Sequence, residues 1–388
     1  MKRLGAFLLV IILALSLGIP VFAKSKLNYE AESVSADFTV KSKSAILIEA
    51  TTGTVLFEQN ADEPASPASV TKIMTLLLAM EALAEERISL SDKIMISEKA
   101  ASMGGSQVFL EEGESMSLEE LLKCTVIASA NDAALALAEH IAGSEDGFVS
   151  QMNLKAKQLG LKNTSFENVT GLDDTTKYHY SSARDISIMS RELIKYDLIT
   201  NFASLWQDTI RGGAFTLTNT NRLVRYYDGC NGLKTGSTAK AGYCISAAAK
   251  RGDMQLIAVI MGAETRDERN AAARELLDFG FANYALYTQK ESALEKVSVK
   301  GGKTPETLLY QREFCAVVPK SDLKKIALVY EIPQYLEAPL APETPVGKII
   351  YKIGDKKIGE SELYVKEKLD KISFLDIFVA LFEKIFSI

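Results

Sequence analysis

Three short segments of the chain place residues at spacings that could support acylation of a serine. In the first, Ser69-Val-Thr-Lys72, the serine and the lysine lie three positions apart. Positions i and i+3 share one face of a helix, so the hydroxyl and the amine can come within hydrogen-bonding distance. At a helix N-terminus, free N–H groups and the positive end of the helix dipole stabilise an oxyanion and disfavour a protonated lysine. Ser69 is therefore a candidate nucleophile and Lys72 a candidate base.

The second segment, Ser129-Ala-Asn131, offers a hydroxyl that could relay protons to a leaving amine and an amide that could hold a substrate carbonyl. It is predicted to connect two helices. Ser117-Leu-Glu-Glu120 is a capping box that begins the first helix, and the second is predicted over residues 133–141 with its end at Gly143. The same serine and asparagine could equally serve only as helix caps.

The third segment, Lys234-Thr-Gly-Ser-Thr238, precedes a strand that is predicted from Tyr243. Lys234 and Thr235 could face an anionic group. Gly236 would let the backbone of a substrate approach the edge of the strand closely. Without such a role, the segment would be an ordinary turn.

The order of the three segments is more specific than any one of them, because each uses common residue types. The three segments lie, in this order, on a predicted helix, a connection and a strand. This order matches the signature of penicillin-binding proteins and class A β-lactamases, in which Ser129-Ala-Asn131 takes the place of the Ser-Asp-Asn motif.

Beyond these motifs, the chain resembles the low-molecular-weight penicillin-binding proteins that are D-Ala-D-Ala carboxypeptidases, the peptidase S11 family. The resemblance extends over nearly the whole chain after a predicted signal peptide. Ala130 replaces a glycine that many members have, and Val169 stands where a proline is usual, but neither position touches a reacting atom. The segments that carry the resemblance are Pro67-Ala-Ser-Val-Thr-Lys72, Gly104-Gly-Ser-Gln107, Ile127-Ala-Ser-Ala-Asn-Asp132, His179-Tyr-Ser-Ser-Ala-Arg-Asp185, Asn221-Arg-Leu223, Gly232-Leu-Lys-Thr-Gly236 and Ala338-Pro-Leu-Ala-Pro342.

The resemblance implies a role for each candidate residue. It makes the enzyme a carboxypeptidase that removes the terminal D-Ala from peptidoglycan stem pentapeptides, with β-lactam antibiotics as covalent inhibitors and with no metal or cofactor. The implied roles are acylating nucleophile for Ser69, proton acceptor for Lys72, proton relay for Ser129, substrate orientation for Asn131, binding of the substrate carboxylate for Lys234 and Thr235 beside Gly236, and an oxyanion hole from the N–H groups of Ser69 and Ser237.

Two other functions compete with this interpretation. A class A β-lactamase needs a glutamate for deacylation, but no glutamate between Ser129 and Lys234 begins a Glu-x-x-x-Asn pattern. A β-rich region after the catalytic unit also favours a carboxypeptidase. The second rival is a penicillin-binding wall scaffold that has lost turnover, and the intact motifs argue against it. Transpeptidase and endopeptidase activities differ only in the acceptor or in the bond cleaved, so the residues leave them open.

Composition and charge exclude other classes. The chain has 388 residues and a net charge of −6, without a basic patch, which argues against a nucleic-acid partner. Its two histidines, His140 and His179, are too few for a multi-histidine metal site, and we interpret both as structural. The four cysteines contain no Cys-x-x-Cys pair, and a bridge between Cys230 and Cys244 remains open.

Both ends of the chain indicate export and a membrane surface. Residues 1–23 are predicted to be a secretory signal peptide, with Lys2 and Arg3 before an apolar run and Ala23 at the exit, followed by a loose leader over residues 24–40. Residues 365–388 are predicted to form an amphipathic helix on the outer face of the cytoplasmic membrane, because charges interrupt its apolar face. The alternative is a terminal helix docked on its own domain.

Between these ends we predict an α+β protein of two domains. Strand signals at residues 44–49, 54–58, 243–249 and 255–261 enclose a helical block, so residues 41–290 should form a β-lactamase/transpeptidase-like catalytic domain with an antiparallel sheet. Short strands then follow one another, and residues 291–364 should form a small all-β domain.

Overall fold

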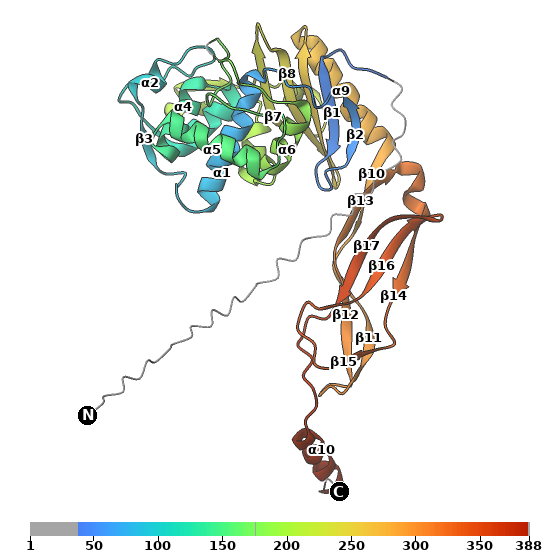
Figure 1. The fold of residues 1–388 in the computed structure, drawn as a ribbon. Helices are drawn as coiled ribbons and strands as arrows, with labels where there is room; N and C mark the ends of the chain where they lie inside the picture. Colours follow the sequence, from blue (N-terminus) through green and yellow to red (C-terminus); the bar gives the residue numbers. More distant parts are fainter. Residues whose placement is uncertain (1–37, 175, 387–388) are drawn as a thin grey trace, which may run out of the picture.

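The structure is a computed structural model that describes residues 38–386 except residue 175 (Figure 1). The predicted signal peptide and nearly all of the predicted leader lie outside the described residues. Figure 1 shows a helical block and a sheet at one end of the molecule, an elongated β-rich part beside them, and a single helix at the far end of that part.

The N-terminal part, predicted as the catalytic domain, is built on a five-stranded sheet of order β2-β1-β9-β8-β7, in which all neighbours are antiparallel. Two strands come before the helical block and three come after it, which confirms the predicted α+β fold. The strands are β1 (Ser44–Glu49), β2 (Val55–Gln59), β7 (Cys230–Thr238), β8 (Gly242–Arg251) and β9 (Met254–Ala263).

Alternating side chains on this sheet bury two opposite faces. On β1, Ile46 and Ile48 pack into the core shared with the helical block. Ala45 and Leu47 pack into a second core with α9 (Arg266–Asn283), which covers the other face. Because successive strand residues point to opposite sides, an uninterrupted apolar strand is what a sheet covered on both faces requires.

The helical block begins with α1 (Lys72–Ala84), and the predicted capping features of two of its helices are confirmed. Ser117 and Glu120 form the capping box of α3 (Leu118–Lys123), and Gly143 ends α4 (Asn131–Ala142) in a left-handed conformation. The other helices are α2 (Glu98–Ala101), α5 (Glu145–Gln158), α6 (Ala183–Leu193), α7 (Asp197–Ala203) and α8 (Leu223–Tyr226), with the strand pairs β3 (Lys93–Met95) and β4 (Ser115–Ser117), and β5 (Gln207–Ile210) and β6 (Phe215–Thr218).

The C-terminal part has its own sheets and its own core. Strand β10 (Tyr284–Gln289) pairs with β13 (Phe314–Pro319), and a six-stranded sheet has the order β14-β16-β17-β12-β11-β15. The domain boundary at residue 290 stays a prediction. The remaining strands are β11 (Ser292–Lys300), β12 (Glu306–Gln311), β14 (Ile326–Glu331), β15 (Tyr335–Glu337), β16 (Pro345–Ile353) and β17 (Lys356–Tyr364).

The last described element is helix α10 (Phe374–Phe386), at the end of the β-rich part that is remote from the catalytic sheet (Figure 1). Its start is capped by Ser373, whose hydroxyl accepts the N–H of Asp376. Among residues 38–386, with residue 175 left out, no helix is long and apolar enough to cross a membrane.

The four cysteines are free thiols, so the bridge that the sequence left open between Cys230 and Cys244 is not formed. The two residues lie on adjacent strands, but Cys244 pairs with Gly236 and Cys230 with Ala249. Gly236 is about 20 Å along β7 from Cys230 at the usual rise per residue, which is too far for a disulfide.

Candidate active site

The candidate nucleophile lies on a tight turn between the sheet and α1. The sequence predicts Ser69 and Lys72 together on the first turn of a helix, but residues Ala68–Thr71 form a 3-10 turn and α1 begins at Lys72. Ala68 has a φ of 46°, in the left-handed region. This geometry brings the Ser69 Oγ within 2.9 Å of the Lys72 Nζ.

Lys72 is fully buried, and three oxygens surround its amine. Besides the Ser69 Oγ, they are the Asn131 Oδ1 at 2.6 Å and the Thr170 carbonyl at 3.0 Å. Burial, and then the nearby charge of Lys234, hold the Lys72 pKa well below its usual range. An amide oxygen and a carbonyl can only accept, so a neutral amine would donate both hydrogens to them and direct its lone pair at the serine hydroxyl.

The segment Ser129-Ala-Asn131 lies where a π-helical turn (Cys124–Ala128) gives way to α4. Ser129 takes a left-handed conformation with a φ of 64°, and this conformation ends the π-helical turn. The Asn131 amide is fixed at both ends, because its Nδ2 donates to the Gly104 carbonyl at 2.6 Å while its oxygen accepts from Lys72.

Lys234 approaches Ser129 from strand β7. Its Nζ donates to the Ser129 Oγ at 2.7 Å and to the Thr235 carbonyl at 2.9 Å. Burial, and then the charge of Arg269, lower the Lys234 pKa to about 7. An anionic substrate group beside Lys234 would raise this pKa again and favour the charged amine.

Gly236 packs closely against the nucleophile turn, where a Cβ would lie 2.8 Å from the Ser69 nitrogen and 2.9 Å from the Val70 nitrogen. Its expected role in admitting a substrate backbone stays a prediction. Its missing side chain lets β7 pack directly against the nucleophile turn. Ser237 follows on β7 with its side chain exposed, and the Thr235 hydroxyl donates to that of Thr220 at 2.8 Å.

A loop before α6 completes the enclosure of Lys72. Gly171 has a φ of +83°, and a Cβ there would lie 1.8 Å from the Ala68 carbonyl oxygen, so only glycine fits against the nucleophile turn. One residue earlier lies the Thr170 carbonyl that faces Lys72, and the Val169 carbonyl accepts from the Thr75 hydroxyl of α1 at 2.7 Å.

Sequence reasoning noted Val169 in this loop but gave the loop no role at the site, and it missed Arg269. Arg269 is 3% exposed on α9, its guanidinium bonds the neighbouring Asn270, and burial lowers its pKa to about 10. The signal was available, because Arg269 shares the buried face of the helix with Ala272, Ala273 and Leu276, where an arginine is unusual. The sequence gave no signal for Thr170, because this residue contacts Lys72 through its main-chain carbonyl, which every residue type has.

His179 is buried in the same region, and two hydrogen bonds define its neutral form. Its Nδ1 accepts the N–H of Glu167 at 3.1 Å, so the ring proton is on Nε2, which donates to the Thr71 Oγ1 at 2.8 Å. Burial lowers the His179 pKa to about 4. The other histidine, His140, contacts Asp92 at 3.2 Å.

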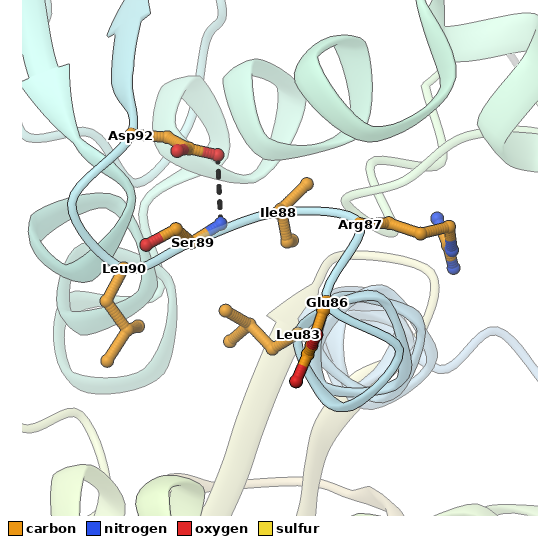
Figure 2. A pocket seen from close by; sticks show the side chains of 7 residues that line it. All are labelled: Leu83, Glu86, Arg87, Ile88, Ser89, Leu90 and Asp92. Atoms are coloured by element: carbon orange, nitrogen blue, oxygen red, sulfur yellow. Dashed lines mark hydrogen bonds between the residues drawn. The ribbon is translucent and has the colours of Figure 1, made fainter.

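An open hollow on the surface is separate from these residues. Leu83, residues 86–90 and Asp92 line it, and the Ser89 N–H donates to the Asp92 carboxylate at 2.9 Å inside it (Figure 2). It lies at the C-terminal end of α1, whose 13 residues place it about 20 Å from Ser69. None of the candidate residues lines it.

The structure therefore brings the predicted residues to one place. Ser69, Lys72 and Asn131 form one hydrogen-bonded group, and Ser129 forms a second with Lys234. A serine beside a buried amine of lowered pKa, with an amide and a second lysine close by, can attack a carbonyl and bind an anionic group.

Comparisons with known proteins agree with this geometry. Residues 30–265 match the family model for D-alanyl-D-alanine carboxypeptidase (peptidase S11), and residues 281–371 match the C-terminal domain of penicillin-binding protein 5. The chain is 44% identical over 382 residues to D-alanyl-D-alanine carboxypeptidase DacF of Bacillus subtilis, covering 97% of this chain and 96% of that protein.

Two solved structures are similar as well. Penicillin-binding protein 5 of Haemophilus influenzae has a TM-score of 0.76 and 32% identity, covering 86% of this chain and 99% of its own. Penicillin-binding protein D2 of Listeria monocytogenes, in its ampicillin-bound form, has a TM-score of 0.58 and 30% identity, covering 63% of this chain and 99% of its own.

The neutral state of His179 predicts a loss of stability in acid. The unfolded histidine binds a proton near pH 6.5 and the folded one only near pH 4, so stability is fully present above about pH 6.5 and is lost as the pH falls toward 4. Such a shift corresponds to about 3 kcal/mol. A His179→Gln variant keeps an acceptor and a donor without titrating, so its urea unfolding should depend less on pH in this window. An equal loss in both proteins would contradict the assignment.

Proposed function

Because this chain belongs to the peptidase S11 family of D-alanyl-D-alanine carboxypeptidases, we propose that it removes the terminal D-Ala from peptidoglycan stem pentapeptides through an acyl-enzyme on Ser69. The observation that carries the proposal is the 2.9 Å contact between the Ser69 hydroxyl and the buried Lys72 amine. A lysine with a strongly lowered pKa is a usable base at neutral pH.

In the acylation step, Lys72 accepts the Ser69 proton while the serine oxygen attacks the carbonyl carbon of the penultimate D-Ala. The N–H groups of Ser69 and Ser237 stabilise the resulting oxyanion. The C–N bond then breaks, and the leaving D-Ala amine takes, through the Ser129 hydroxyl, the proton that Lys72 accepted from Ser69. Water next adds to the ester and releases the shortened peptide, which restores the Ser69 hydroxyl.

Positive charge beside Ser129 suits the free carboxylate of the substrate. Lys234 and the Thr235 hydroxyl bind that carboxylate in this proposal, and the buried charge of Arg269 adds to the attraction because it is near enough to lower the Lys234 pKa. Asn131 orients the peptide with the amide hydrogen that Gly104 does not use.

β-Lactams offer the same two groups, a reactive carbonyl and a carboxylate, so they should acylate Ser69 and inhibit the enzyme. The ampicillin-bound relative from Listeria monocytogenes supports this expectation. A β-lactamase is not favoured. Glu167, the glutamate nearest to Thr170 in the chain, bonds instead to the N–H groups of Lys177 and Tyr178.

We further propose that the enzyme is exported and that α10 lies on the outer surface of the cytoplasmic membrane. None of its described side chains is buried, and Phe374 is 83% exposed. An uncovered apolar helix of this kind argues against docking on its own domain and fits an interface between water and lipid. The β-rich part would then act as a spacer between this surface and the catalytic part.

Loss of the nucleophile or the base should abolish turnover. With diacetyl-Lys-D-Ala-D-Ala as substrate, we expect D-alanine release by the wild-type enzyme and a fall of at least about 1,000-fold for Ser69→Ala and for Lys72→Ala. Ser204→Ala, at an exposed serine, is the matched control. A stable benzylpenicillin adduct without D-alanine release would indicate a scaffold or a strict transpeptidase, and rapid loss of the adduct would indicate a β-lactamase.

Removal of the terminal helix should release the enzyme from membranes without affecting catalysis. The truncation should end at Ile372, because Leu369 is buried and pairs with Leu340 in the β-rich part. We expect the full mature chain to sediment with anionic phospholipid vesicles and the truncated chain to stay in the supernatant with unchanged D-alanine release. A double Phe378→Ser and Phe382→Ser variant should also stay in the supernatant, and Glu383→Gln is its control.

A truncated chain that still sedimented with the vesicles would remove α10 as the anchor.

A further inference from the structure

Asp173 is a buried carboxylate that the proposed mechanism does not use. It is 8% exposed and lies two residues after Gly171, in the loop that packs against the nucleophile turn. One of its oxygens, Oδ2, accepts two hydrogen bonds, from the Ser66 Oγ at 2.7 Å and from the Thr238 Oγ1 at 2.6 Å.

The two hydroxyls belong to the two chain segments that carry the N–H donors of the proposed oxyanion hole. Ser66 lies three residues before Ser69, and Thr238 directly follows Ser237. A single carboxylate oxygen therefore joins the segment that carries one oxyanion-binding N–H to the segment that carries the other.

Each of the two hydroxyl-bearing residues is anchored in its own segment. The residue before Ser66, Ala65, exchanges two main-chain hydrogen bonds with Ser181, at 2.8 and 3.0 Å. The Thr238 hydroxyl also accepts the Ala241 N–H at 2.9 Å, in the turn between β7 and β8. Because each hydroxyl moves with its own segment, a carboxylate oxygen that binds both hydroxyls couples the two segments to each other.

The separation between the two segments has little tolerance. The β7 backbone packs so closely on the nucleophile turn that a single Cβ on Gly236 would come within 2.8 Å of the Ser69 nitrogen. An oxyanion hole works only when both donors lie about 2.7–3.1 Å from the developing charge, and a shift of about 1 Å can lower a rate about 100-fold.

We propose that Asp173 is a positioning residue that sets the distance between the Ser69 and Ser237 N–H groups by holding Ser66 and Thr238 on one carboxylate oxygen. The inference rests on the proposed function, because it takes these two groups to be the oxyanion hole. The oxyanion exists only in the transition state and the tetrahedral intermediate. Loss of Asp173 should therefore lower kcat and the acylation rate and leave substrate binding nearly unchanged.

The test compares Asp173→Ala with Asp173→Asn in the full mature enzyme. For Asp173→Ala we expect kcat for D-alanine release and the benzylpenicillin acylation rate to fall about 10- to 100-fold, with KM within about threefold. A boronic-acid analogue of the substrate, whose serine adduct is tetrahedral and negatively charged, should bind about tenfold more weakly or worse. Asp173→Asn keeps an oxygen that accepts both hydroxyls, so it should stay within about threefold of wild type.

Thr238 provides a second pair of variants if Asp173→Ala does not fold. Thr238→Val removes the hydroxyl and Thr238→Ser keeps it, so only the valine variant should show the loss in acylation and boronate affinity. If the carboxylate acts through its two hydroxyl partners, adding Asp173→Ala to a Ser66→Ala and Thr238→Val double variant should cause no further loss.

Three results would overturn the inference. The first is a folded Asp173→Ala enzyme with wild-type acylation and boronate affinity. The second is a rise in KM that accounts for the whole loss of kcat/KM, because that would indicate a binding role. The third is an Asp173→Asn variant as impaired as the alanine variant, because charge rather than position would then matter. If the wild-type enzyme itself formed no Ser69 adduct, the proposed function would fail first and this inference with it.

Discussion

A buried amine held by three oxygens is the constraint on which the rest of the active site depends. The oxygens around the Lys72 Nζ come from Ser69 one turn earlier, from Asn131 on α4 and from the Thr170 carbonyl in the loop before α6. Asn131 and Thr170 are distant from Lys72 in sequence, so only the folded chain brings their oxygens to its amine. The fold thus supplies what a lone Ser-x-x-Lys sequence lacks, which is a buried site that holds the pKa of the lysine well below its usual range.

This arrangement has a cost in folding free energy. Unfolded lysines keep their protons up to about pH 10.4, whereas the folded chain binds the protons of Lys72 and Lys234 less tightly. The unfolded state therefore binds more protons at neutral pH, and stability contributed by these two groups rises with pH. Close packing offsets part of the cost, because Gly171 and Gly236 let two backbone segments lie directly against the nucleophile turn. Proteins commonly accept such a loss of stability where activity requires it.

The sequence predicted what depends on local spacing. The capping box at Ser117, the end of α4 at Gly143 and the contact between Ser69 and Lys72 all follow from residues within a few positions of one another. The α+β class followed from the order of strand and helix signals. Contacts between distant segments could not be predicted in the same way: no pattern places Lys234 against Ser129, or the Thr170 carbonyl against Lys72, because tertiary packing alone creates them. The sequence singled out Gly236 for a role toward substrate, whereas its close contact with the Ser69 turn is visible only in the assembled fold.

The most direct test of the central claim, that Lys72 is a neutral base for Ser69, is the pH dependence of acylation. The rate constant for adduct formation with benzylpenicillin would be measured by intact mass at low inhibitor concentration, with Ser69→Ala as the blank. Since acylation requires the deprotonated amine, the rate should rise with pH through the lowered Lys72 pKa, so the ascending limb should end well below pH 10. A rate that kept rising toward pH 10, where an ordinary lysine titrates, would contradict the account.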